Sequence, residues 1–195
     1  MGTVVRKFAR KRGMITTQLS AYEVELLTSL VKQLVELVSD GEPAGFRTRG
    51  EPADEFDALV ADLQVDPDEP EISEDPVLKR LFPAAYPDDP ASSSDFRRFT
   101  ERDLRAQKVA EAQVVLNRLE ATALGAHDLK IPRDEVEAWL RTLTSVRLAV
   151  ATRLGITDAE TAERLADLPE EDPRSFLISV YDWLGFAQET MVNAL

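Results

Sequence analysis

The side chains that carry most enzyme chemistry are scarce in this sequence. His127 is the single histidine and cysteine is absent, so a multi-histidine metal site and a thiolate nucleophile are both excluded for this chain. We expect His127 at a helix end or in the connection formed by residues 125–131, and not as a general base. Phosphate-binding glycine motifs of the Walker A or Gly-x-Gly-x-x-Gly kind are also absent. The sequence therefore predicts a protein that is not an enzyme, with no catalytic, cofactor-binding or metal-binding residues.

One acidic run begins like a calcium-binding loop. Residues 66–71 read Asp-Pro-Asp-Glu-Pro-Glu. An EF-hand loop needs a turn glycine at its sixth position and a glutamate at its twelfth, but Glu71 and Val77 stand there. Calcium binding is therefore not expected.

A basic arm lies near the start of the chain and surrounds Phe8. Its five cations are Arg6, Lys7, Arg10, Lys11 and Arg12. Clustered cations beside an aromatic ring can bind phosphates and stack on a base, which would suit nucleic acid. We favour a solvated hairpin rim whose charge pairs with the acidic remainder of the chain, and keep contact with nucleic acid or with an acidic protein as alternatives.

Residues 176–195 are apolar around nearly the whole helical circumference. One face has the spacing of a core face, and a second apolar face lies beside it. The first contains Leu177, Val180, Tyr181, Leu184 and Met191, and the second contains Phe176, Trp183, Phe186 and Ala187. We expect one face to close the core and the other to meet a partner or a second copy, with Trp183, Phe186 and Met191 as contact candidates.

Arg147 lies within an apolar stripe of the helix expected at residues 132–154. A cation at such a position needs a counter-charge if it is buried. We therefore expect a structural ion pair with a carboxylate, with Glu23 or Asp103 as candidates, or exposure at an interface. A second pattern, Arg97-Glu101-Arg105, predicts a ladder of ion pairs on a solvated face.

Residues 151–168 have the glycine spacing of a helix-turn-helix motif. The candidate recognition helix, however, carries four acids against Arg164 alone, and its carboxylates would face phosphates. A plain helical hairpin, ended by Gly155 with Ile156 as its hydrophobic contact, explains these residues better than major-groove recognition.

Charge is distributed unevenly along the chain. The first 13 residues hold the five cations and no acid, so the rest carries −18 against a total of −13. This body should repel nucleic acid. Residues 41–75 hold twelve acids and two arginines, which is typical of a solvated linker, and a short amphipathic helix is expected at about residues 53–64 within it. No apolar run reaches the length of a membrane span, and we expect a cytoplasmic protein.

Local signals predict a mainly α-helical fold: a bundle of about six to seven helices with a small N-terminal β-hairpin. Helices should begin after Ser20, in a capping box with Glu23, and at the two Asp-Pro pairs at residues 75–76 and 172–173. Further helices are expected at residues 94–123, 132–154 and 158–168, the last behind a capping box at residues 157–160. Strands are expected at residues 3–8 and 14–19. We expect a single domain, 1–195, with the arm at 1–19, the linker at 41–75 and the helical core at 76–195.

Several runs, taken in order, resemble the actinobacterial AosR-like family, described as oxidative-stress-responsive regulators and formerly as a domain of unknown function encoded near the ClpS protease adaptor. The matching runs are Asp-Pro with LFPAAY (75–86), FRRFTERDLR (96–105), AWL with RLA (138–149) and VYDWLG with QE (180–189). The resemblance implies a transcription-linked regulatory protein. Because this chain has no cysteine, it cannot sense oxidants through a disulfide of its own.

Together these features predict a non-enzymatic regulator that acts mainly through protein–protein contacts. The partner would be a transcription component or a Clp-linked protein, and a homodimer is a further alternative. The competing functions are direct DNA binding as a transcriptional regulator and an adaptor role in Clp proteolysis. No membrane contact is expected.

Overall fold

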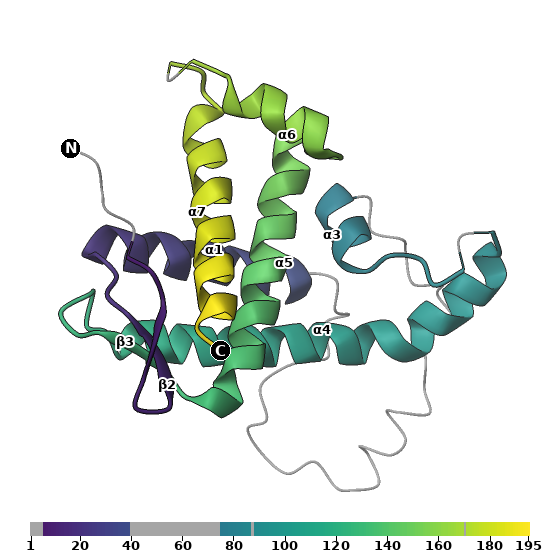
Figure 1. Cartoon of the computed structure of the whole chain (residues 1–195). Coiled ribbons are helices and arrows are strands. Elements are labelled where there is room, and N and C mark those ends of the chain that lie inside the picture. The colour runs from purple at the N-terminus through teal and green to yellow at the C-terminus, as the bar shows by residue number, and fades with distance from the viewer. Residues whose placement is uncertain (1–5, 40–74, 87, 170) are drawn as a thin grey trace, which may run out of the picture.

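The computed structural model describes residues 6–39, 75–86, 88–169 and 171–195, which form a mainly α-helical fold with a small antiparallel sheet (Figure 1). The elements are, in order, β1 (Ala9–Lys11), β2 (Met14–Thr17), α1 (Ala21–Ser39), α3 (Pro76–Leu81), α4 (Pro90–Glu120), β3 (Leu129–Ile131), α5 (Val136–Leu154), α6 (Ala159–Ala166) and α7 (Ser175–Asn193). A 3-10 turn, Arg133–Glu135, leads into α5. The predicted fold class is confirmed. The linker and its expected helix fall almost wholly outside the described residues.

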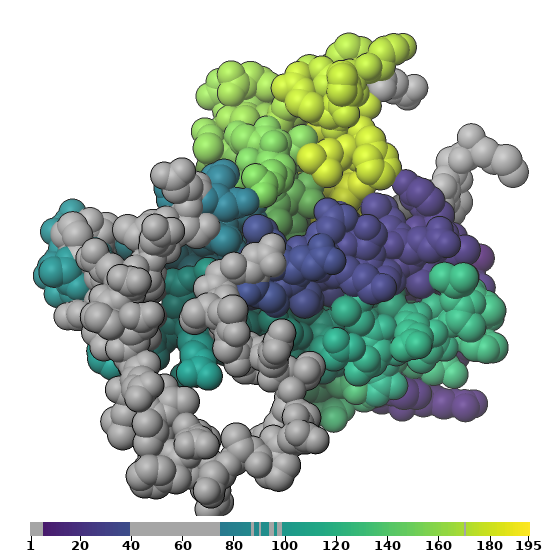
Figure 2. Space-filling model, turned by 180° about the vertical axis from the view of Figure 1, so that it is seen from behind, coloured from purple at the N-terminus to yellow at the C-terminus, as the bar shows by residue number. Residues whose placement is uncertain are grey.

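Two pairs of helices make up the body. α1 and α4 lie side by side, as Figure 1 and the opposite view in Figure 2 both show, and α5 and α7 form a second pair packed across them. α3 packs on α5, and α6 contacts α7. The interior between the pairs is filled by large apolar side chains that are almost completely buried, including Val31, Leu119, Trp139, Leu143 and Leu184.

The start of α1 follows the predicted capping box. The backbone N–H of Glu23 donates to Ser20 Oγ at 3.2 Å, and the backbone N–H of Ser20 donates to Glu23 Oε2 at 2.7 Å. Leu19 and Val24 flank this box and are both buried, as a hydrophobic staple requires. α1 is therefore fixed at its first turn by local chemistry and by the core together.

Asp-Pro pairs begin two helices. Asp75 Oδ1 accepts from the backbone N–H of Val77 at 2.7 Å and caps α3 as predicted. Asp89 caps α4 in the same way through the N–H of Ser92, at 3.1 Å. α4 therefore starts at Pro90, earlier than the predicted residue 94. Asp89-Pro90 is the same Asp-Pro signal that predicts the start of α3.

Two predicted helix starts are displaced. Asp172 accepts from the N–H of Arg174 instead of capping a helix, and α7 begins only at Ser175. α6 is capped by Asp158, whose side chain accepts from the N–H of Thr161, so the cap lies one residue after the predicted box. In both places neighbouring Asp and Thr residues offer competing caps, and local spacing alone does not choose between them.

The N-terminal hairpin is shorter and lies later than predicted. Its strands are β1 and β2, joined by a two-residue turn in which Arg12 and Gly13 have φ of +53° and +82°. β2 pairs on its other side with β3, and Ile15 lies opposite Ile131. β3 was not predicted, because it has three residues and is stabilised by a strand far away in the sequence.

Candidate interaction surface

Among the residues that the structure describes, no group of histidine, aspartate and glutamate side chains could hold a metal ion. His127 is exposed in the turn before β3, within the predicted connection. Within the same described ranges, no helix has the length and apolar character of a membrane span. The functional features of the described residues are therefore sought on the surface of the fold, where the basic arm and α7 meet.

The basic arm is docked on the end of α7. Phe8 is buried, and its backbone N–H donates to Thr190 Oγ1 at 3.4 Å. Arg10 Nη1 donates to the main-chain oxygen of Leu195 at 2.9 Å. All five arm cations are exposed residues, although Arg6 also borders a small cavity beneath the arm and Arg10 bonds Leu195. Phe8 therefore anchors the arm while its cations remain accessible from solvent. The two sequence features singled out separately, the arm and the last helix, are thus one surface.

The three contact candidates on α7 lie in three different environments. Trp183 packs against the core, and its indole N–H donates to Glu23 Oε1 at 3.2 Å, which ties α7 to the start of α1. Met191 is 0% exposed, so the expectation that it contacts a partner is wrong for this fold: it belongs to the core face that its spacing also indicated. Phe186 is half-buried and lies outside the core cluster.

Further apolar side chains are exposed beside the arm. Val192 and Leu195 are 53% and 57% exposed. Together with Phe186 and the five arm cations they form what we call the arm–α7 surface. Val192 and Leu195 were not among the predicted contacts, and Val192 lies six residues after Phe186, which turns it about 120° around the helix from Phe186.

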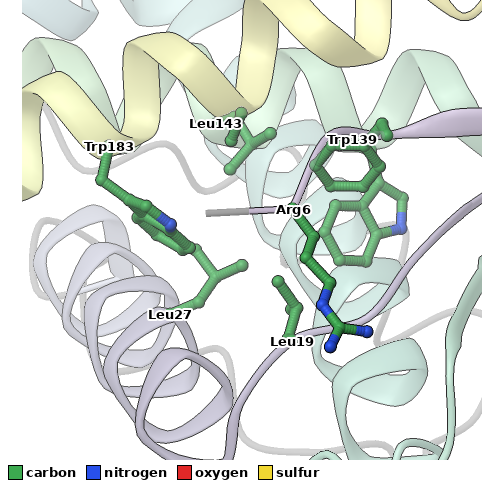
Figure 3. Close-up of a pocket in the computed structure, with 8 residues that line it drawn as sticks. Arg6, Leu19, Leu27, Trp139, Leu143 and Trp183 are labelled. Carbon is green, nitrogen blue, oxygen red and sulfur yellow. The ribbon is translucent and has the colours of Figure 1, made fainter. Parts of the chain in front are cut away.

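A small cavity lies beneath the arm. It has a volume of about 10 Å³ and is bounded by Phe8 of the arm and by side chains of α1, α5 and α7. Figure 3 shows Trp139 and Trp183 on opposite sides of it, with Leu143 and Leu19 between them. This space suits about one water molecule and is far too small for an organic cofactor. The arm therefore seals the core and does not cover a ligand site.

Arg147 does not pair with a carboxylate of the described residues, which corrects the predicted ion pair. Its guanidinium carbon lies 4.5 Å from the ring centroid of Tyr181, and its Nε is buried without a hydrogen-bond partner. Gly185 makes room, since a Cβ there would lie 3.0 Å from Arg147 Nη2. Glu23 is instead used by Ser20 and Trp183. The aromatic face takes the place expected for a carboxylate.

Arg105 also departs from its predicted solvated face. It is 6% exposed, pairs with Glu101, donates from Nη1 to the carbonyl of Val38 at 2.6 Å and lies 4.7 Å above the ring of Phe82. The Arg97 side chain lies outside the described residues. The spacing predicted the ion pair of Arg105 with Glu101 correctly. The burial of Arg105 depends on which side of α4 packs against α1, and the local sequence does not contain that information.

α5 and α6 form the helical hairpin that the sequence predicts, with Gly155 at the end of α5. Gly155 is in the left-handed conformation, and the N–H of Ile156 donates to the carbonyl of Ala151 at 2.8 Å, closing the end of α5. Ile156 is buried. The acids of α6 and its cap are exposed, and Leu165 is the α6 residue that is buried. The exposed side of α6 therefore presents carboxylates.

Fold and surface together define a mainly α-helical protein with a docked basic arm and, in its described part, no metal cluster. Over residues 5–195 the chain matches the family described as a domain of unknown function, DUF2017, and it belongs to that family. It is 29% identical over 211 aligned residues to the Mycobacterium leprae (strain TN) protein named "Putative oxidative stress regulator AosR", an alignment that covers 100% of this chain and 90% of the relative. No solved structure matches. The resemblance to AosR-like proteins is thereby confirmed, and the relative supports a regulatory role.

Proposed function

We propose that this chain is a non-enzymatic regulatory protein that acts through protein–protein contacts at the arm–α7 surface. The observation that carries the proposal is the docking of the arm by Phe8 and Arg10 on the end of α7, which gathers five exposed cations beside exposed apolar side chains. Apolar contacts with a charged rim are typical of protein interfaces. A partner with an acidic rim fits, and the arm would steer its approach.

Two classes of foreign partner are compatible with the regulatory role that the relative's name supports and with the resemblance to a family encoded near the ClpS adaptor. An oxidative stress regulator without cysteine must receive its signal from elsewhere, and a transcription component supplies both a signal and an output. A Clp-linked protein is the second class, in which case the chain serves as an adaptor. A second copy of the chain is a third occupant of the same surface.

The test compares two substitutions on α7. Phe186→Glu places a charge at a half-buried position of the arm–α7 surface, whereas Phe176→Glu places one at the opposite end of the helix, where Phe176 is 55% exposed. Native complexes are purified with each variant, crosslinked and mapped by mass spectrometry, and the mass of the isolated chain is measured by light scattering. Phe186→Glu should lose the crosslinked partner while Phe176→Glu keeps it.

The light-scattering measurement distinguishes a homodimer from a complex with a foreign partner. A mass that falls with Phe186→Glu identifies a second copy, whereas an unchanged monomer mass with loss of a crosslinked protein identifies a foreign partner. Crosslinks that avoid both the arm and the end of α7 would contradict the proposal. Circular dichroism of each variant establishes that the fold persists.

A further inference from the structure

A second surface lies between α4 and α5 and is closed at one end by α3. It is an open groove of about 350 Å³ that shares no residue with the arm–α7 surface. Four leucines from three helices form its apolar part: Leu81 of α3, Leu104 of α4, and Leu140 and Leu148 of α5. Leu104 is 44% exposed, so this apolar surface is open to solvent.

The groove also holds a lysine without an acidic partner. Lys108 is half-buried, and its Nζ donates to Ser145 Oγ at 3.0 Å and lies 5.9 Å from the ring centroid of Phe82. It forms no ion pair with any carboxylate of the described residues. Glu111, the nearby acid, is paired with Arg141 at 2.9 Å. Burial is the main cause that lowers the pKa of Lys108, and the charge of Glu111 opposes this shift.

An ammonium group has three N–H donors, and Ser145 uses one of them. A half-buried cation with donors to spare is stabilised by a carboxylate brought to it, because the interaction is stronger where water is partly excluded. The groove therefore offers an apolar wall and one anion contact side by side.

Two further apolar side chains are exposed nearer the N-terminal end of α4. Phe96 and Phe99 are 44% and 74% exposed, and the ring of Phe96 meets that of Tyr86 edge to face at 6.1 Å. Phe96 lies eight residues before Leu104, which places the two on roughly the same side of the helix. Figure 1 shows that this half of α4 extends beyond α5. The groove itself follows residues 104–111 of α4 and 140–148 of α5, about two helical turns of each, which suits a helix better than a small molecule.

We propose that this groove binds an acidic amphipathic helix of a partner protein. Apolar residues at i, i+3, i+4 and i+7 of the partner rest on the four leucines, and a carboxylate beside them pairs with Lys108. A second copy offers no such helix within its described residues, because the acidic helix α6 buries its own Leu165. Charge complementarity thus selects the partner: a basic helix would meet Lys108, whereas Arg141 is already paired with Glu111 and Glu137 and adds no unpaired charge.

The test uses a synthetic peptide of sixteen residues labelled with fluorescein, with leucine at i, i+3, i+4 and i+7, a single glutamate beside the leucines, and alanine or serine elsewhere. Its binding to the full chain is followed by fluorescence anisotropy at physiological salt, where long-range repulsion by the acidic body is screened. A matched peptide carries glutamine in place of glutamate. The full chain should bind the glutamate peptide about tenfold more tightly than the glutamine peptide.

Three variants locate the site. Lys108→Gln should weaken binding of the glutamate peptide about tenfold and leave the glutamine peptide unaffected, because it removes only the ion pair. Leu104→Glu, at an exposed position where the fold tolerates the change, should abolish binding of both peptides. Lys130→Gln removes an exposed lysine of β3 outside the groove and should change neither affinity.

Other occupants give distinct results that overturn the proposal. If the peptide binds only after Phe56→Ser and Leu59→Ser, residues 53–64 of the chain itself compete for the groove. If Leu104→Glu lowers the mass of the isolated chain, a second copy is bound there. Equal affinity for both peptides, no effect of Lys108→Gln, or no binding at all contradicts the charge-selective site. Phe186→Glu should bind the peptide normally, so this test and that of the proposed function fail independently.

Discussion

Arg105 joins three parts of the molecule at one guanidinium group. Its Nη1 donates a hydrogen bond to the carbonyl oxygen of Val38. Val38 lies in the last turn of α1, where carbonyl groups have no partner within the helix. Arg105 also pairs with Glu101 on its own helix and covers the ring of Phe82, which follows α3. A single side chain therefore fixes the end of α1 and the segment after α3 against α4.

Replacing Arg105 should destabilise the fold. Arg105→Ala leaves the Val38 carbonyl and Glu101 without this donor in a mostly dry environment, and we expect it to lower the free energy of unfolding by about 2–4 kcal/mol. Urea denaturation followed by circular dichroism measures this. Arg153→Ala is the matched control, because Arg153 pairs with Asp75 at an exposed position and should cost less than about 1 kcal/mol. Equal losses in the two variants would refute the structural role given to Arg105.

The pair of Arg118 and Glu135 predicts a dependence of stability on pH. The hydrogen bond from Arg118 is the main cause that lowers the pKa of Glu135 below its usual 4.5. A carboxyl with a depressed folded-state pKa contributes stability above its unfolded-state pKa and loses it as the pH falls through the folded-state pKa. At pH 7, Glu135→Gln should therefore destabilise the protein, by less than about 1 kcal/mol because the pair is partly exposed. The difference from wild type should shrink below pH 4.5. A difference that grows with acid would contradict this assignment.

At the scale of elements, two glycines that follow helices share a left-handed backbone conformation but differ in their surroundings: Gly155 caps α5, and Gly125 lies in the turn after α4. Gly125 and Gly155 have φ of +82° and +72°. A Cβ at Gly155 would meet nothing within 4 Å, but one at Gly125 would lie 2.6 Å from the carbonyl oxygen of Leu19. The turn after α4 therefore packs directly on the backbone that leads into α1.

Alanine at each glycine separates conformation from packing. Gly155→Ala should cost about 1–2 kcal/mol for the left-handed conformation alone. Gly125→Ala should cost clearly more, since backbone atoms near Leu19 must also move. Thermal unfolding of both variants tests the order. A smaller loss for Gly125→Ala than for Gly155→Ala would show that the contact with Leu19 is not constraining.

The elements also show what the sequence could predict. Capping at Ser20 and Asp75 and the helix end at Gly155 depend on neighbours within a few residues, and these predictions are confirmed. β3, the burial of Arg105 and the docking of the arm on Thr190 depend on partners far away in the sequence. Periodicity does not contain that information. The spacing of apolar residues in α7 predicts one face buried in the core and a second face for a partner. Met191 belongs to the core face and is completely buried, so it cannot also contact a partner.

At the scale of the whole molecule, the absence of cysteine restricts how an oxidative signal can reach this chain. Peroxide at levels that oxidise thiols should leave its fold and its partner affinity unchanged, because methionine is the remaining sulfur-containing residue and Met191 is buried. Circular dichroism and partner titration before and after peroxide test this. A change that a thiol reductant reverses would contradict it, and a response carried by the partner alone would agree with it.

The charge distribution favours a protein partner over DNA, and the salt dependence of DNA binding tests this expectation. If the five arm cations bind phosphates, the affinity for DNA should fall with salt at a log–log slope of roughly −4 to −5, near −0.9 for each contact. Removing residues 6–12 should flatten that slope. We expect instead weak binding without sequence preference, because the rest of the chain carries −18 and the exposed side of α6 presents carboxylates that repel a polyanion.

The measurement is a titration of the isolated full chain with a DNA duplex at several salt concentrations. Its comparison is the variant in which Arg10, Lys11 and Arg12 are replaced by glutamine, which keeps Phe8 as the anchor of the arm. Tight, sequence-selective binding at physiological salt that this variant loses would reverse the order of the two mechanisms. Weak DNA binding in both forms, together with loss of the protein partner in the glutamine variant, would show that the arm steers the approach of an acidic protein. The five exposed cations of the arm, with Val192 and Leu195 exposed at the end of α7, suit such a partner.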